Sequence, residues 1–142
     1  MVSAHDVAAY ILGKQGPMSA MKLQKLVYYA QAWSLVWEDR PLFGERIEAW
    51  AHGPVVPELY REHRGQFEVR AWERGNAASL QPADRETVDA VLDYYGGRNA
   101  QVLSDWTHSE DPWKHARSGV SDGERGNSEI TLDSMMEYYS SL

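Results

Sequence analysis

The stretch from Met21 to Trp37, MKLQKLVYYAQAWSLVW, constrains the fold of this chain more than any other segment. Two apolar arcs run along it at the spacing of an α-helix. The first arc contains Leu23, Leu26, Val27, Ala30, Trp33 and Trp37, and the second contains Met21, Tyr28, Ala32 and Leu35. The seams between the arcs are formed by Gln24 and Gln31 on one side and by Lys22, Lys25 and Tyr29 on the other. A surface helix needs only one apolar arc, so the pattern predicts a central helix that is covered on two sides.

The residues that flank this stretch predict where the helix begins and ends. Ser19 is in place to act as the N-cap, because its hydroxyl can accept a free N–H of the first turn. Asp39, Arg40 and Pro41 end the helix, since a residue before proline is disfavoured in the α region. At about 17 residues, the helix exceeds the globular average of about 11 or 12.

Length and composition predict a single domain that spans residues 1–142. Domains cluster near about 100–150 residues, and a chain with 43% hydrophobic and 25% charged residues has the composition of an ordinary globular protein. There is no cysteine, which excludes disulfides and thiolate metal sites. No signal peptide pattern and no apolar run of about 20 residues is present. We therefore expect a cytoplasmic protein without a membrane segment.

The charge is negative and unevenly distributed. The chain carries a formal net charge of −7, and residues 61–142 hold nine basic and fifteen acidic residues. Such a field repels a phosphate backbone, and no basic stripe of the kind that nucleic-acid binding needs is present. The charge therefore argues against nucleic acid as a partner and suits a basic protein, with a solvated acidic surface that binds no partner as the more common alternative.

The remaining elements are predicted from periodicity and turn residues. A first short helix covers His5 to Leu12, with Ser3 available as its cap. Alternating residues predict short strands at 47–52 and 67–72, which could pair with each other, and Pro57 begins a helix that reaches His63. An isolated two-stranded ribbon is marginal in water, so it must pack on the helices.

The second part of the chain is predicted to be mainly helical. Pro82 opens a helix that Gly96 and Gly97 end, Asn99 caps the next helix, and a short helix covers Trp113 to Arg117. A Gly- and Ser-rich segment at about 118–128 predicts a flexible loop, and a last amphipathic helix covers about 130–140. The predicted fold class is mainly α: a single-domain helical bundle around a central buried helix, with a small antiparallel β-ribbon.

No pattern of catalytic residues stands out. A Gly-x-Ser-x-Gly elbow and Gly-rich phosphate loops are absent. His108, Glu110, Asp111 and His115 could form a metal-dependent or hydrolytic site, but Pro112 separates the histidines and HExxH is missing. Helix capping explains the two carboxylates more simply.

We expect no catalytic residue, no cofactor and no metal, with an enzyme built on these four side chains as the alternative class. A DNA-binding regulator is a third possibility, and it requires an exposed basic face on residues 19–37.

The bend between Trp50 and Tyr60 is the candidate binding site. A strand that stops at Gly53-Pro54 and a helix that starts at Pro57 would form a rigid corner. The residues we expect to contact a partner there are Trp50, His52, Val55, Val56, Glu58 and Tyr60. One interpretation is a structural corner, and the other is a preorganised apolar surface that loses little entropy when it binds a protein.

Three motifs resemble one known family. KLQKLVYYAQAW (Lys22 to Trp33), PLFGERIEAWAHGPVVPELY (Pro41 to Tyr60) and LSDWTHSEDPW (Leu103 to Trp113) together resemble the Panacea, or SocA-like, antitoxin domain, which is also found in phage-associated proteins. The resemblance extends from the first helix to about Arg117.

The resemblance implies a mainly helical domain with a small β element, encoded beside a toxin gene. Members of the family neutralise varied toxins, mostly by direct binding, and one relative acts as an adaptor that delivers its toxin to an AAA+ protease. The expected partner is thus a cognate toxin, with an AAA+ protease as the alternative.

Overall fold

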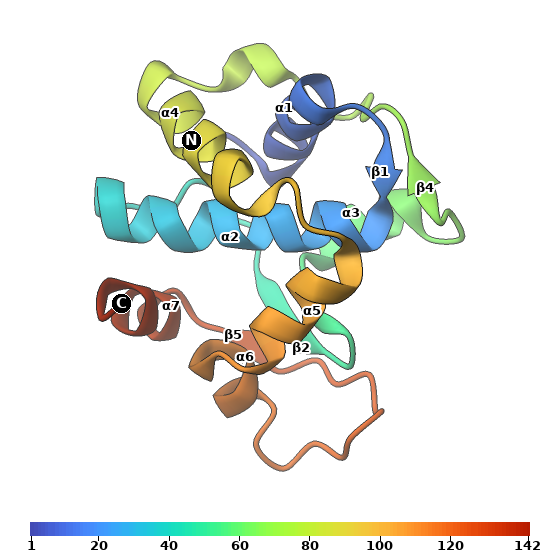
Figure 1. The fold of residues 1–142 in the computed structure, drawn as a ribbon, viewed down its shortest axis with the longest axis vertical. Coiled ribbons are helices and arrows are strands. Elements are labelled where there is room, and N and C mark those ends of the chain that lie inside the picture. The colour runs from blue at the N-terminus through green and yellow to red at the C-terminus, as the bar shows by residue number, and fades with distance from the viewer.

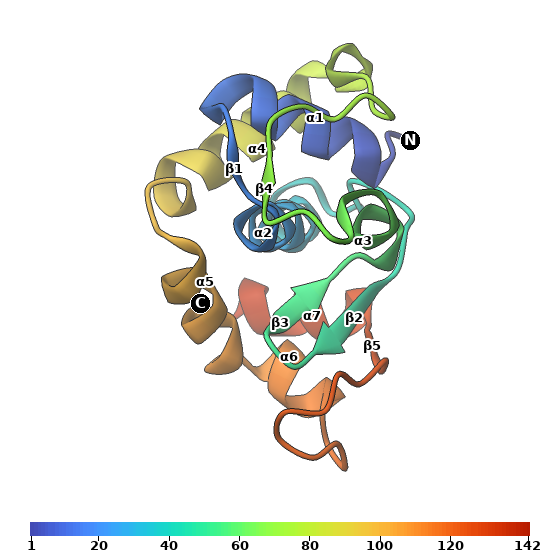
Figure 2. The ribbon, with the colours of Figure 1, turned by 90° about the vertical axis from the view of Figure 1, so that its right-hand side faces the viewer.

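Helix α2 (Ala20–Glu38) is the element around which the chain folds in the computed structural model, which describes residues 1–142. It crosses the molecule in Figure 1, and Figure 2, which looks along it, shows the other elements on all sides of it. Ser19 Oγ accepts a hydrogen bond from the Lys22 N–H at 3.1 Å, and Asp39 ends the helix in the left-handed region at φ 55°. The predicted central helix and its N-cap are confirmed.

Burial of α2 goes further than the two covered sides that the sequence predicts. The first arc is buried at Leu23, Leu26, Val27 and Ala30, and the second at Tyr28, Ala32 and Leu35. The seam residues Gln24, Lys25, Tyr29 and Gln31 are also buried. Only the ends of the apolar arcs reach solvent, where Trp37 is 49% exposed.

Two helices lie along one side of α2 (Figures 1 and 2), α1 (Ala4–Gln15) and α4 (Pro82–Tyr95). Ser3 caps α1, as predicted, by accepting from the Asp6 N–H at 3.2 Å. Helix α1 runs through Gly13 and ends three residues later than expected. A short 3₁₀ turn, η1 (Ala77–Ser79), precedes α4.

Helices α5 (Ala100–His108), α6 (Asp111–Ala116) and α7 (Leu132–Ser140) lie on the opposite side of α2. Asn99 caps α5, as predicted, by accepting from the Val102 N–H at 2.9 Å. The last helix starts at Leu132 because Thr131 is its N-cap. Helix α3 (Pro57–His63) has the predicted bounds.

The predicted ribbon between residues 47–52 and 67–72 is wrong. Strand β2 (Ile47–Trp50) pairs antiparallel with β3 (Gly53–Val55) and with β5 (Glu129–Ile130). Strand β4 (Glu68–Val69) pairs instead with β1 (Met18–Ser19). The reason is a tight turn at Ala51-His52, which lets the chain reverse at once and satisfy the β2 backbone locally.

The fold class is mainly α with small antiparallel sheets, as predicted. One hydrophobic core reaches from Val2 to Tyr139 and includes residues of α1, α2, α4, α5 and α7. No helix combines the length and the apolar character needed to cross a bilayer.

Candidate functional site

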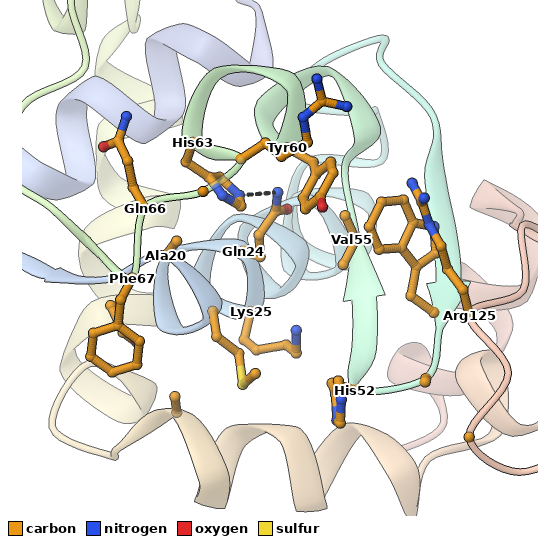
Figure 3. A pocket seen from close by; sticks show the side chains of 18 residues that line it. Ala20, Gln24, Lys25, His52, Val55, Tyr60, His63, Gln66, Phe67 and Arg125 are labelled. Carbon is orange, nitrogen blue, oxygen red and sulfur yellow. Dashed lines mark hydrogen bonds between the residues drawn. The ribbon is translucent and has the colours of Figure 1, made fainter.

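A groove of about 520 Å³ opens between the first half of α2, the β2–β3 hairpin and the segment from Tyr60 to Phe67 (Figure 3). We call it the bend groove. Four of the six predicted partner-binding residues line it, namely Trp50, His52, Val55 and Tyr60. The tight hairpin turn and the start of α3 at Pro57 bring these side chains to one surface.

The other two predicted residues lie elsewhere. The Val56 side chain is fully buried, and its backbone is held by Gln24: the Val56 N–H donates to Gln24 Oε1 at 2.8 Å, and Gln24 Nε2 donates to the Val56 carbonyl at 3.2 Å. Val56 therefore supports the groove from beneath. Glu58 does not line the groove and pairs with Arg61 on the exposed side of α3.

An aromatic pair with a stacked arginine forms one wall of the bend groove. The rings of Trp50 and Tyr60 meet edge to face with centroids 4.9 Å apart. The Arg125 guanidinium lies 3.7 Å from the Trp50 ring centroid, which is cation–π geometry. Trp50 Nε1 donates to Glu48 Oε1 at 2.9 Å. These contacts hold the wall in place before any partner arrives.

Arg117 positions the loop that carries Arg125. Its buried guanidinium donates to the carbonyls of Ala49, Arg125, Ser121 and Glu124 at 2.7 to 3.1 Å. The loop is thereby tied to strand β2. Sequence reasoning missed Arg125, because the Gly- and Ser-rich composition around it predicts mobility and gives no sign of a contact.

Phe67 is the second lining residue that the sequence did not single out. It is 86% exposed at the rim of the bend groove (Figure 3). The alternation of residues 67–72 assigned it to a strand face, but β4 contains only Glu68 and Val69. Exposing so much aromatic surface to water is unfavourable in free energy. The position of Phe67 beside a groove therefore favours a role in binding a partner.

A buried lysine forms part of the groove floor. Lys25 is 1% exposed, and its Nζ donates to the Pro54 carbonyl at 3.2 Å. Burial lowers the pKa of Lys25 to about 7. Gly53 makes room for it, because a Cβ there would collide with Lys25 Cε, and its φ of 123° also favours glycine.

The groove lining is positive although the protein is negative. Arg64 and Arg125 line it, no carboxylate does, and Lys25 adds its charge as the pH falls below its pKa of about 7. His63 adds no charge near neutral pH. Gln24 Nε2 donates to His63 Nε2 at 3.0 Å (Figure 3). Burial, together with the nearby charge of Lys25, lowers the pKa of His63. The groove can therefore take an apolar or acidic segment.

The four residues of the alternative enzyme site do not converge on a metal position. The His108 ring stacks on Trp113 with centroids 4.0 Å apart, whereas His115 is exposed and lies 4.0 Å from Asp111. Burial lowers the pKa of His108, and its Nε2 has no hydrogen-bond partner. No group of three or more His, Asp or Glu side chains is arranged to hold a metal ion.

Glu110 departs from the capping role that the sequence suggests. It occupies the N-cap position of α6, but its side chain makes no capping hydrogen bond. Its Oε1 accepts instead from Tyr29 and Tyr139. Asp111 does lie in the first turn of α6, where a negative charge is favourable.

Helix α2 has no exposed basic face for DNA. Its two basic residues are Lys22 and Lys25. Lys25 is buried, and Lys22 Nζ donates to the Gly96 carbonyl at 2.6 Å. The feature that a DNA-binding regulator would require is therefore missing from residues 19–37.

Comparisons with known proteins point to one family. The model of the family described as "Antitoxin SocA-like, Panacea domain" matches residues 23–114. The protein named "Antitoxin SocA" of Caulobacter vibrioides is 44% identical over 64 residues, which cover 42% of this chain and 34% of that relative. The chain thus spans about a third of the length of the curated relative it matches. No solved structure matches the chain.

Proposed function

The chain belongs to the SocA-like Panacea antitoxin family, and from this premise we propose that it is the antitoxin of a toxin–antitoxin system that neutralises its cognate toxin by direct protein–protein binding. No catalytic step is assigned to it. The bend groove is the proposed contact surface. The side chains that meet the toxin are His52, Val55, Tyr60 and Phe67, of which Tyr60 belongs to the aromatic wall that it forms with Trp50 and Arg125.

The single observation that carries this site is the preorganised aromatic wall of the groove. Trp50 is held by Tyr60, Arg125 and Glu48 in the free protein. Side chains that are already ordered lose little entropy on binding, and Trp, Tyr and Arg are the residue types most enriched at binding hot spots. The groove therefore offers both the chemistry and the rigidity of a protein-binding surface.

The charge distribution suggests how a toxin approaches. The net charge of −7 gives a negative surface that steers a basic toxin, whereas the groove itself is lined by cations without a carboxylate. The toxin segment that enters the groove is thus apolar or acidic, even where the toxin as a whole is basic.

Co-expression with the product of the neighbouring gene tests the proposal. Growth rescue and co-purification would be scored for the parent and for His52→Ala, Val55→Asp, Tyr60→Ala and Phe67→Ala. Truncating a hot spot costs about 2 kcal/mol or more, which is roughly a 30-fold loss of affinity, so at least one folded groove variant should bind that much more weakly. Leu132→Ala is the matched control, since it removes an exposed apolar side chain from α7, away from the groove.

Two outcomes would change the proposal. If all the groove variants are folded, rescue growth and bind as the parent does, the bend groove is not the toxin site. If rescue occurs without a stable complex and depends on a host AAA+ protease, delivery of the toxin for proteolysis replaces sequestration.

A further inference from the structure

A second cavity, of about 700 Å³, lies at the other end of α2 from the bend groove. Its walls come from α2, α4, α5, the turn at Ser109-Glu110 and Leu142, and it shares no lining residue with the groove. We call it the aromatic cavity, because five of its lining residues are Trp33, Trp37, Tyr94, Tyr95 and Trp106. Glu110 is its only charged lining side chain.

The rings of the aromatic cavity are held relative to one another. Trp33 and Trp37 stack with centroids 5.1 Å apart, and Trp33 Nε1 donates to the Tyr95 hydroxyl at 3.0 Å. Trp106 lies 6.0 Å from Tyr95 and 6.1 Å from Tyr94 between centroids. Trp37 is 49% exposed and Tyr94 is 63% exposed, so ring surface remains open to a ligand.

Glu110 brings a carboxylate with a free oxygen to this wall. Its Oε1 accepts from the Tyr29 hydroxyl at 2.9 Å and from the Tyr139 hydroxyl at 2.7 Å. No protein donor forms a hydrogen bond with Glu110 Oε2. This oxygen is not fully buried, so it is open to solvent. Glu110 forms no salt bridge, and desolvation raises its pKa although the two tyrosine hydroxyls act in the opposite direction.

The hydrogen bonds to the tyrosines do not by themselves account for a carboxylate at this position. A glutamine oxygen would accept from Tyr29 and Tyr139 equally well, without the cost of desolvating a charge. The Arg98 guanidinium lies 5.2 Å from the Trp106 ring centroid, but Arg98 neither lines the cavity nor pairs with Glu110. The charge of Glu110 is therefore left without a counterion in the folded chain.

We propose that the aromatic cavity binds an arginine side chain of a protein partner, with the guanidinium stacked on the tryptophan rings and donating to Glu110 Oε2. A planar guanidinium is suited to this site because it stacks on aromatic faces and hydrogen-bonds to a carboxylate at the same time. The negative net charge of the protein favours the same kind of partner.

A pair of capped amino acids provides the probe. N-acetyl-arginine methylamide is titrated into the isotope-labelled protein while the indole N–H signals of Trp33, Trp37 and Trp106 are followed by NMR. N-acetyl-citrulline methylamide, which has nearly the same shape without the charge, is titrated in parallel. The arginine probe should shift these signals saturably and bind roughly tenfold or more tightly than the citrulline probe, since each tenfold corresponds to about 1.4 kcal/mol.

Variants separate the site from general attraction to a negative protein. Glu110→Gln keeps both tyrosine hydrogen bonds and should abolish the preference for arginine, while Trp37→Leu, at a half-exposed position, should weaken arginine binding severalfold. Glu86→Gln and Leu132→Ala, which lie outside both sites, are the matched controls and should change neither.

Three outcomes would each overturn the proposal: equal binding of the two probes, no saturable shift up to the solubility limit, or an arginine preference that survives in Glu110→Gln. Since the probes contain no toxin, this test is independent of the one for the bend groove.

Discussion

At the scale of the residue, Lys25 is a buried amine whose Nζ has one hydrogen-bond acceptor in the protein. It is 1% exposed, its Nζ donates only to the Pro54 carbonyl, and it forms no salt bridge. Desolvation disfavours the charged form and lowers the pKa from 10.5 to about 7. Between these two values the unfolded chain holds the proton more tightly than the folded protein does, so stability rises as the pH rises.

We predict that the free energy of unfolding increases by about 3 kcal/mol between about pH 7 and about pH 9.5, because each unit of pKa difference is worth about 1.4 kcal/mol. The window ends there because burial raises the pKa values of Tyr28 and Tyr29 above 10, and their ionisation acts in the opposite sense at higher pH. Urea unfolding at several pH values measures the effect. Lys25→Met should lack most of the increase, and an equal increase in that variant would assign it to other groups.

At the scale of the element, the loop from residue 118 to residue 127 depends on one buried guanidinium. Arg117 donates to four backbone carbonyls, three of them in the loop and one, Ala49, in β2. The loop has few other bonds, such as that from the Glu124 N–H to the Ser121 carbonyl at 3.1 Å. The flexibility that the composition predicts for about 118–128 stays a prediction, which hydrogen exchange can measure.

We predict that Arg117→Met releases this loop. Exchange of the Glu124 amide should accelerate at least tenfold, and the Trp50 indole signal should shift because Arg125 no longer stacks on it. Of the four carbonyls, that of Ala49 is the buried one, and leaving it unpaired costs about 1–3 kcal/mol, so the free energy of unfolding should fall by a similar amount. Arg98→Met is the control, since that arginine stacks on Trp106 without binding loop carbonyls. Unchanged exchange at Glu124 would show that the loop is ordered by other contacts.

At the scale of the whole molecule, the C-terminal segment completes the core around α2. Strand β5 pairs with β2, and Met135 and Tyr139 of α7 are buried in the same cluster as residues of α1. The Tyr139 hydroxyl lies 3.0 Å from that of Tyr28 and donates to Glu110. The single domain that length and composition predict for residues 1–142 stays a prediction, and one contiguous core is consistent with it.

We predict that Met135→Ala destabilises the whole protein by about 2–5 kcal/mol, the usual cost of emptying a buried site. If the chain is one cooperative unit, the slowest-exchanging amides of α1 should lose the same amount of protection as those of α7. Leu132→Ala, at a partly exposed position on the same helix, should have little effect. A loss of protection confined to α7 would show that the C-terminal segment unfolds independently.

The sequence by itself determined the features that are decided within a few residues. The apolar arcs of residues 21–37 determined the central helix, and Ser3, Ser19 and Asn99 determined where three helices begin, because a cap and its N–H lie three residues apart. Pro57 likewise determined where α3 begins. These outcomes need only the local chain. The strand end predicted at Gly53-Pro54 is wrong, because the chain turns at Ala51-His52 and both residues lie inside β3.

The tertiary structure alone decided which distant groups meet. Gln24, Lys25 and Gln31 appear in the sequence as polar seams, but each is buried because it bonds to backbone groups of later segments, at Val56, Pro54 and Phe43 respectively. The tertiary structure also decided which strands pair, that Arg125 stacks on Trp50, and that Tyr29 donates to Glu110. Periodicity reports which side of an element is apolar, but it carries no information on which remote donor or acceptor will satisfy a buried polar group.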